Sequence, residues 1–244
     1  MNPDTQKKNA AFSLIELSIV LIVIGIVMGV VLVGRTLINQ SQLHKIVASY
    51  HQYFMAVRLF KEQYNALPGD YADAFTVWGT SCAADAARCN GNNNDVISYD
   101  SGVNPDDDRE SMRVWQHLTL SKILPGSYSG VGAIYNSTNT PQIGFLDGEF
   151  FIESSPSWNW SQSQNGMMFA AASSGSWNGL LTPNEAQKID VKVDNGIANT
   201  GNLYGITGPN GTSNNSCSGR HGWGGSADYN LLSSQRACYL AWFF

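Results

Sequence analysis

The sequence predicts an α+β protein in which one long N-terminal helix precedes a domain with an antiparallel sheet. The first observation behind this is an apolar stretch, residues 12–33, that continues as an amphipathic pattern to residue 64 without a proline. The second is a series of short apolar runs between Gly, Asn and Ser residues in the C-terminal two-thirds, a pattern typical of strands joined by turns. We expect a long helix over residues 12–64 and a globular domain over 65–244.

The apolar stretch is long enough to cross a membrane. Residues 12–33 contain a single charged side chain, Glu16. At about 1.5 Å per residue, a helix of this length spans roughly 33 Å, which matches the apolar layer of a bilayer. Lys7 and Lys8 precede the stretch, so we expect a transmembrane helix over 12–34 with its N-terminus in the cytoplasm.

Two simpler interpretations of this stretch leave something unexplained. A cleaved secretory signal has an apolar core of only about 7–15 residues, followed by a site of small residues. A plain membrane anchor explains the length but not Glu16, because a carboxylate at the membrane centre costs about 2.5–3.5 kcal/mol, and less near the edge. An interaction that compensates the charge of Glu16 is therefore expected.

Residues 7–17, KKNAAFSLIEL, resemble the processing site of type IV prepilins and type II secretion pseudopilins. The resemblance implies that prepilin peptidase removes a leader, residues 1–11, by cutting between Ala11 and Phe12, and that Phe12 is then N-methylated. Glu16 takes the place of the family's carboxylate at the fifth mature position, which pairs with the terminal amine of a neighbouring subunit. Ala11 stands where the family usually has Gly.

The resemblance implies a pilin-like fold and a structural role. The expected function is a filament subunit, inserted as a single-pass precursor in the bacterial inner membrane and polymerised into a periplasmic or extracellular type IV pilus. Its partners would be other copies of itself, or related subunits, together with prepilin peptidase and the assembly machinery. A type II secretion pseudopilin is one alternative. A membrane-tethered binding protein that never polymerises is an alternative of another class.

The elements of the globular domain follow from local patterns. The helix is expected to end before Pro68 and Gly69. Further helices are predicted over 110–123 and 183–188, the second with Thr182 and Glu185 as a capping box. The predicted strands are residues 142–145, 149–152, 166–171, 189–193 and 239–244, with a hairpin turn at Asp147-Gly148.

The cysteine count indicates disulfides. Four cysteines in an exported chain predict two bonds with three possible pairings. We favour Cys82–Cys89 and Cys217–Cys238, because each pair closes a local loop rich in small and polar residues. A zinc site is the alternative, but the sequence has no CxxC spacing.

A calcium site is a weaker possibility. Residues 90–97 place oxygen-bearing side chains at alternate positions, which resembles the first half of a calcium loop. The candidate ligands are Asn90, Asn92, Asn94 and Asp95. The alternative is a solvated acidic loop, because the glycine and glutamate of a complete calcium loop are missing. No other cofactor is expected.

Other classes of function find little support. The net charge of −5 and the scattered basic residues argue against nucleic-acid binding. The sequence has no GxSxG or HExxH motif, and His117 lies in an apolar turn, so we expect no enzyme. Four tryptophans in polar segments could form an adhesive surface or fill the core: Trp158, Trp160, Trp177 and Trp223.

Overall fold

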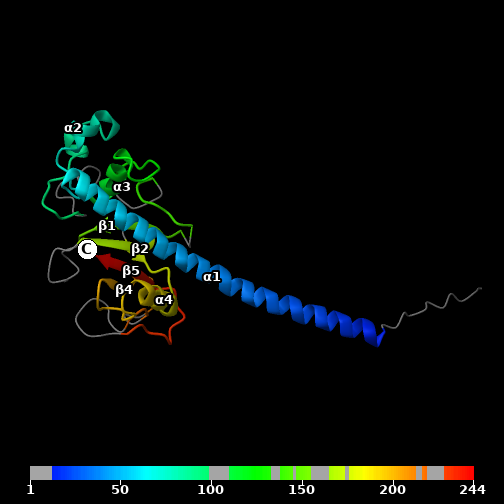
Figure 1. The fold of residues 1–244 in the computed structure, drawn as a ribbon. Coiled ribbons are helices and arrows are strands. Elements are labelled where there is room, and N and C mark those ends of the chain that lie inside the picture. The colour runs from blue at the N-terminus through cyan, green and yellow to red at the C-terminus, as the bar shows by residue number, and fades with distance from the viewer. Residues whose placement is uncertain are drawn as a thin grey trace, which may run out of the picture. The chain divides into compact units, whose positions relative to one another are not determined.

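The computed structural model describes residues 13–98, 110–132, 138–144, 147–154, 165–173, 176–212, 216–218 and 228–244; the side chains of 172–177 are not included. The chain divides into two compact units, Met1–Gln42 and Leu43–Phe244. One helix, α1 (Leu14–Tyr64), begins in the first unit and ends in the second (Figure 1). The long helix predicted from the sequence is therefore confirmed.

Helix α1 contains no proline and ends where the backbone is forced to turn. Its 51 residues correspond to a length of roughly 76 Å. Asn65 follows the helix with a φ of 51°, and Gly69 has a φ of 89°, so two residues in left-handed conformations redirect the chain. Within the second unit, α1 buries one face, which consists of Leu43, Ile46, Tyr50, Ala56, Val57 and Phe60.

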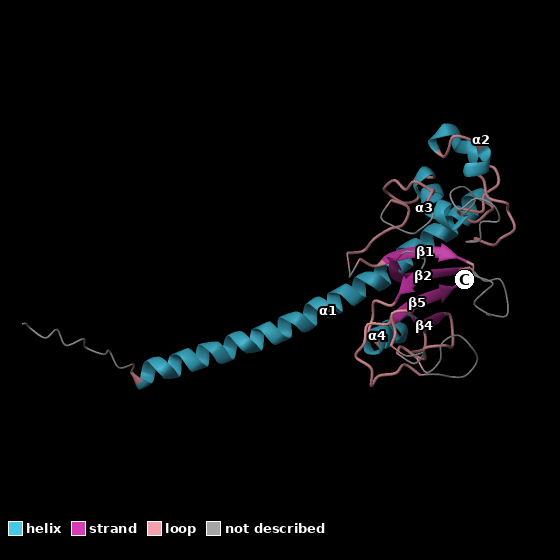
Figure 2. Cartoon of the chain, turned by 180° about the vertical axis from the view of Figure 1, so that it is seen from behind, coloured by secondary structure: helices cyan, strands magenta, loops and turns pink. Residues whose placement is uncertain are grey.

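The described part of the second unit contains three shorter helices, which Figure 2 shows together with the sheet. They are α2 (Ala74–Trp78), α3 (Glu110–Leu120) and α4 (Pro183–Val193). Two single 3-10 turns, Gly79–Ser81 and Ala86–Arg88, lie between α2 and α3 in the sequence. Thr182 and Glu185 form the predicted capping box at the start of α4, where Pro183 occupies the first turn.

An antiparallel sheet forms the centre of the second unit. Its strands are β1 (Glu149–Glu153), β2 (Gly166–Ser173), β4 (Leu203–Thr207) and β5 (Cys238–Phe243), in the order β1-β2-β5-β4 (Figure 2). A short strand, β3 (Ser176–Asn178), pairs with the end of β2. The C-terminal strand β5 therefore lies between β2 and β4, inside the sheet and not at an edge.

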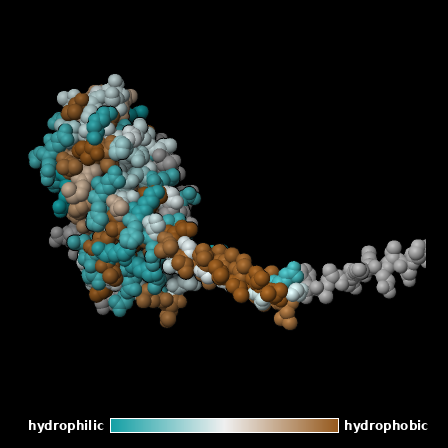
Figure 3. Space-filling model, turned by 45° about the vertical axis from the view of Figure 1, so that its right-hand side comes forward, coloured by the Kyte–Doolittle hydropathy of each residue, from teal (hydrophilic) through white to brown (hydrophobic). Residues whose placement is uncertain are grey.

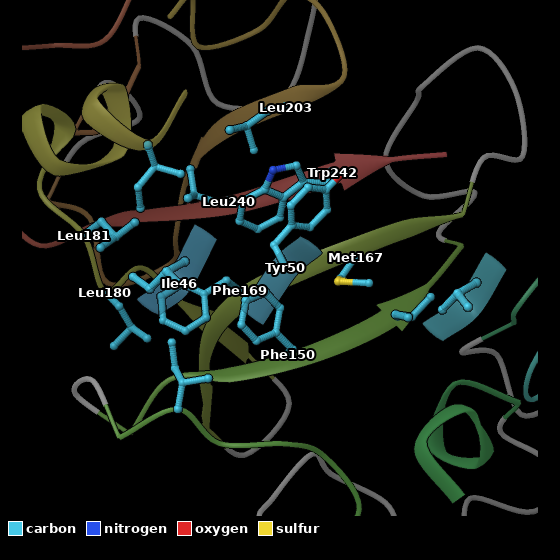
Figure 4. Packing of buried hydrophobic residues seen from close by; sticks show 14 of the residues in the cluster. Ile46, Tyr50, Phe150, Met167, Phe169, Leu180, Leu181, Leu203, Leu240 and Trp242 are labelled. Atoms are coloured by element: carbon cyan, nitrogen blue, oxygen red, sulfur yellow. The ribbon is translucent and has the colours of Figure 1, made fainter. Parts of the chain in front are cut away.

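Successive side chains of each strand point to opposite faces of the sheet, and both faces pack against other buried residues. On one face, Phe150, Met167, Phe169, Leu240 and Trp242 join the cluster that includes the buried residues of α1. Tyr50 of α1 stacks on Trp242, with ring centroids 4.5 Å apart (Figure 4). The alternate residues form the opposite cluster: Phe151, Met168, Ala170, Tyr239 and Ala241, together with Met112 of α3.

The structure corrects two of the predicted strands. Residues 189–193 are the end of α4, because the capping box starts a helix that continues through Ile189, which is fully buried, and Val191, which is 64% exposed. Residues 142–144 form no strand; Gln142 makes only an isolated bridge to Glu149 across the turn at Asp147. Strands β3 and β4 were not predicted from the sequence.

Candidate functional site

The first part of α1 presents an apolar surface. Within the first unit Leu14, Ile15 and Val30 are 88%, 67% and 67% exposed, and the other aliphatic residues up to Val33 are 45–66% exposed. Figure 3 shows this surface in brown. Among the residues that the structure describes, α1 is the one helix long and apolar enough to cross a membrane. Such a surface indicates burial in lipid or against other chains.

Glu16 lies in the first turn of this helix. Its carboxylate accepts a long hydrogen bond, 3.4 Å, from the backbone N–H of Ser13. The helix macrodipole also favours an anion at this end, so two local effects ease the presence of the charge in an apolar segment. The predicted cleavage and methylation residues, Ala11 and Phe12, lie outside the residues described.

Three glycines in the apolar part of α1 lie where another helix could approach closely. An added Cβ at Gly25, Gly29 or Gly34 would meet nothing within 4 Å in the isolated chain. Their lack of side chains therefore has no explanation within a single copy. Small residues at this kind of spacing let the backbones of neighbouring helices approach closely in membranes.

The four cysteines form the two disulfides that the sequence favoured. One joins Cys82 to Cys89 and the other joins Cys217 to Cys238. The second bond ties the start of β5 to the segment after β4. The first closes a small loop whose backbone is held by α3, since Gln116 donates from Nε2 to the carbonyl of Cys82 at 2.7 Å.

His117 of α3 is a buried structural residue. Its Nδ1 accepts a hydrogen bond from the N–H of Gly69 at 2.9 Å, so Nε2 carries the proton and donates to the carbonyl of Cys89 at 3.0 Å. Burial, the largest effect, lowers the pKa of His117 to about 3 even though the Cys89 bond opposes the shift, and the neutral form persists near neutral pH.

The same tautomer argues against metal binding at this place. Cys82, Cys89 and His117 bring three ligand-type atoms within 4.8 Å of one another. Both sulfurs, however, are consumed by the disulfide. The imidazole has one lone pair, at Nδ1, and that lone pair already accepts from Gly69. The residues present do not fit a metal ion.

The four residues singled out for calcium have separate partners. Asn90 accepts at Oδ1 from the N–H of Phe75. Asn92 and Asn94 each accept from the N–H two residues further on, as turn-forming asparagines do. Asp95 forms an exposed ion pair with Lys61 at 3.2 Å.

The polar face of α3 was missed by the sequence reasoning, which assigned only its apolar face. Glu110, Arg113, Gln116 and His117 recur at helical spacing and all are buried. Their side chains hold the loop that contains the first disulfide; Arg113, for instance, donates to the carbonyls of Asn90 and Ala87. The three- and four-residue spacing of these polar groups was the available signal, and the same spacing is typical of a solvent-exposed helix face.

The aromatic residues that the structure describes mostly fill the core. Trp115 and Trp242 are completely buried, and the ring of Tyr53 meets the ring of Trp115 edge to face. Of the tryptophans considered for adhesion, Trp158, Trp160 and Trp223 lie outside the described residues. Trp177 belongs to β3, but its side chain is not described.

Comparison with known proteins bears on the N-terminal segment. Residues 6–32 match the family described as the prokaryotic N-terminal methylation motif. Neither the curated proteins nor the solved structures gave a significant match. The match covers the basic residues before the helix, Glu16 and nearly all of the apolar stretch, and the long apolar helix agrees with it. The chain therefore carries the prokaryotic N-terminal methylation motif at residues 6–32, and this motif together with the long apolar helix supports a prepilin-type protein.

Proposed function

We propose that this chain is the structural subunit of a type IV pilus-like filament. The observation that carries the proposal is the position of Glu16, a lone carboxylate one turn into an exposed apolar helix and inside the matched motif. Proteins with this motif are typically structural subunits and not enzymes, and we assign no catalytic role. The chain would enter the inner membrane through α1, and prepilin peptidase would cut it between Ala11 and Phe12.

The chemistry of Glu16 explains why assembly would need it. A carboxylate transferred into an apolar layer costs about 2.5–3.5 kcal/mol at the membrane centre unless a cation accompanies it. After cleavage, the N-methylated amine of Phe12 is such a cation. In a filament the amine of one copy would pair with Glu16 of the next, and neighbouring apolar surfaces of α1 would cover each other. The exposed glycines would permit that close approach.

The second unit has features typical of a domain located outside the cytoplasm. It contains two disulfides, and disulfides persist in oxidising compartments such as the periplasm or the cell exterior. The domain boundaries that we propose are the leader at 1–11, the helix at 12–64 with its membrane segment at 12–34, and the globular domain at 65–244. A filament exposed to solvent would display this domain on its surface.

Replacement of Glu16 tests polymerisation separately from membrane insertion. The Glu16→Ala and Glu16→Gln variants would be produced in cells that lack the wild-type copy. We expect both to fractionate with membranes, because the apolar helix is unchanged, and to be absent from sheared filaments. Glu62→Ala, which removes an exposed carboxylate near the other end of the same helix, is the matched control and should assemble normally.

The outcomes separate the competing functions. Normal filaments from both Glu16 variants would contradict the role proposed for Glu16. A wild-type chain that stays in the membrane and enters no filament would instead favour a membrane-tethered binding protein. Loss of cell-surface pili from cells that make the Glu16 variants would support a type IV pilus. Loss of protein secretion, with pili retained, would instead support a type II secretion pseudopilus.

A further inference from the structure

The outward side of α4 is basic and apolar, whereas the domain around it is acidic. Residues 65–244 contain 16 acidic and only 8 basic residues. Three exposed side chains lie within little more than one turn of α4, namely Lys188, Val191 and Lys192. Val191 is 64% exposed. These three residues are called the lysine face below, and they form a small positive surface on a negatively charged domain.

The carboxylates in this part of the chain are turned inward. Asp190 is completely buried, and it accepts at Oδ1 from the N–H of Gly196 and at Oδ2 from the hydroxyl of Tyr229, both at 2.8 Å. The half-buried Asp194 accepts at Oδ2 from the N–H of Leu203, the first residue of β4, at 3.0 Å. The fold therefore separates the charges of this segment, because the carboxylates bind groups of the protein while the two lysines face the solvent.

The lysine face lies at the end of the second unit where α1 enters it. Lys192 donates from Nζ to Nε2 of His44 at 3.1 Å, and His44 is the second residue of that unit. Figures 1 and 2 show α4 at the opposite end of the unit from α2 and α3. An ammonium group has three N–H donors, so Lys192 can bind a further acceptor without losing its bond to His44.

The distance from the lysine face to a lipid surface is limited by the length of α1. This distance rests on the membrane segment that the proposed function assigns to residues 12–34. His44 follows that segment by ten residues, so at most about 15 Å of helix separates it from the apolar core of the bilayer. The headgroup layer occupies about 5–8 Å of this distance. The rest is comparable with the Debye length of about 8 Å in physiological salt, so the lysine face lies within electrostatic range of the headgroups.

We propose that the lysine face binds the anionic phospholipid headgroups of the membrane that α1 crosses. Lys188 and Lys192 would donate to headgroup phosphates, and Val191 would enter the boundary between headgroups and acyl chains. Charge complementarity favours this occupant, because an anionic surface repels the rest of an acidic domain and so selects this one face. Attachment through α1 also keeps the lipid at a high effective concentration. The contact would orient the globular domain on the bilayer before the chain joins a filament.

Lysine labelling of the full chain in vesicles tests the contact. The chain would be reconstituted in vesicles of phosphatidylcholine alone, or of an equal mixture with phosphatidylglycerol, and treated with a water-soluble N-hydroxysuccinimide ester. Mass spectrometry then measures the labelling of each lysine. Lys188 and Lys192 should react about fivefold more slowly in the anionic vesicles, the factor that one basic side chain contributes near such a surface. High salt should remove the difference, because it screens the headgroup charge.

Two other exposed lysines are internal controls for the labelling. Lys61 lies in the last turn of α1, and Lys122 follows the end of α3. Both should react at the same rate in the two kinds of vesicle.

A photoreactive side chain placed at position 191 gives a second readout. It should capture phospholipid in the anionic vesicles. Lys188→Gln/Lys192→Gln in the same chain should reduce the captured lipid about tenfold or more, although α1 still holds the chain in the vesicle. Lys61→Gln/Lys122→Gln removes the same charge from other exposed positions and is the matched control. It should capture as much lipid as the parent chain.

Flotation of the vesicles separates the outcomes. A chain that floats with both kinds of vesicle, but whose Lys188 and Lys192 react equally in both, would overturn the lysine-face contact and leave the membrane segment of α1 intact. A chain that floats with neither would contradict both. Slow labelling of the lysine face that is equal in neutral vesicles, and grows with the ratio of protein to lipid, would overturn the lipid contact in favour of a second copy of the chain.

Discussion

The backbone N–H of Gly69 donates to Nδ1 of His117 over 2.9 Å, and this bond joins the exit of α1 to the buried face of α3. The opposite nitrogen of the same ring donates to Cys89 in the first disulfide. One imidazole thus connects three segments that are far apart in the sequence. Since protonation would turn an accepting nitrogen into a donor facing an N–H group, the connection depends on a neutral ring.

We predict that His117 makes the fold sensitive to acid. The pKa of His117 is about 3 in the folded chain and about 6.5 when unfolded, so its contribution is complete above 6.5 and is lost as the pH falls towards 3. The stability difference between wild type and His117→Gln should shrink by about 1.4 kcal/mol per pH unit below 6.5. Urea unfolding at several pH values measures it. A difference independent of pH would contradict the assignment of a neutral, buried ring. His51→Gln, on an exposed position of α1, is the matched control.

Gly69 should tolerate no side chain. Its φ of 89° disfavours any L residue, and a Cβ would lie 2.4 Å from the carbonyl oxygen of Glu110. We predict that Gly69→Ala lowers the free energy of unfolding by about 3 kcal/mol or more. Gly79→Ala is the control, because Gly79 also has a positive φ but has open space around it. The free energy of unfolding of Gly79→Ala should fall by only about 1 kcal/mol. Equal losses at both positions would show that crowding by Glu110 is unimportant.

The two disulfides should contribute unequally to the stability of the folded chain. On the chain-entropy account, the bond with a sequence separation of 21 stabilises by about 3 kcal/mol and the one with a separation of 7 by about 2.5 kcal/mol. The measured difference between the two contributions should be larger than this, because α3 still holds the smaller loop when the Cys82–Cys89 bond is removed. Thermal unfolding of the Cys82→Ser/Cys89→Ser and Cys217→Ser/Cys238→Ser double variants checks this. A larger loss from the first pair would be the contrary result.

Glu185 should anchor the start of α4 to the segment before β5. Its carboxylate accepts from the N–H of Thr182 at 3.0 Å and receives both terminal nitrogens of Arg236, at 2.8 and 2.9 Å. We predict that Glu185→Ala lowers the free energy of unfolding by about 2 kcal/mol, because the helix cap and the ion pair with Arg236 are lost together. Lys188→Ala, on the exposed side of the same helix, should stay within about 0.5 kcal/mol of wild type by urea unfolding.

The local features of the sequence predicted the elements that depend on local chemistry. Helix α1 needs only an uninterrupted apolar and amphipathic pattern, and its end needs only Pro68 and Gly69. The start of α4 was found for the same reason, since a capping box is contained within four residues. Strands β1, β2 and β5 were recognisable because both of their faces are buried, which leaves short continuous apolar runs.

The remaining elements depend on contacts that a local pattern cannot show. In residues 189–193, β-branched side chains alternate with polar ones, as in a strand, yet the helix already started at Pro183 continues through them. Strand β4 has a glycine at its centre, and Gly205 is needed there because a Cβ would lie 2.6 Å from the hydroxyl oxygen of Tyr229. The attachment of residues 92–94 to Asp70 and Glu110 was not predicted, because the carboxylates and this segment come together only in the folded chain.

The central claim is that the chain is processed as a prepilin and assembled through its new N-terminus. Mass spectrometry of the protein isolated from sheared filaments or membranes tests it most directly. Our account predicts a mature terminus at Phe12 with one added methyl group on its amine, and loss of residues 1–11. A protein that keeps its Met1 terminus, or one cut after the apolar helix, would contradict it.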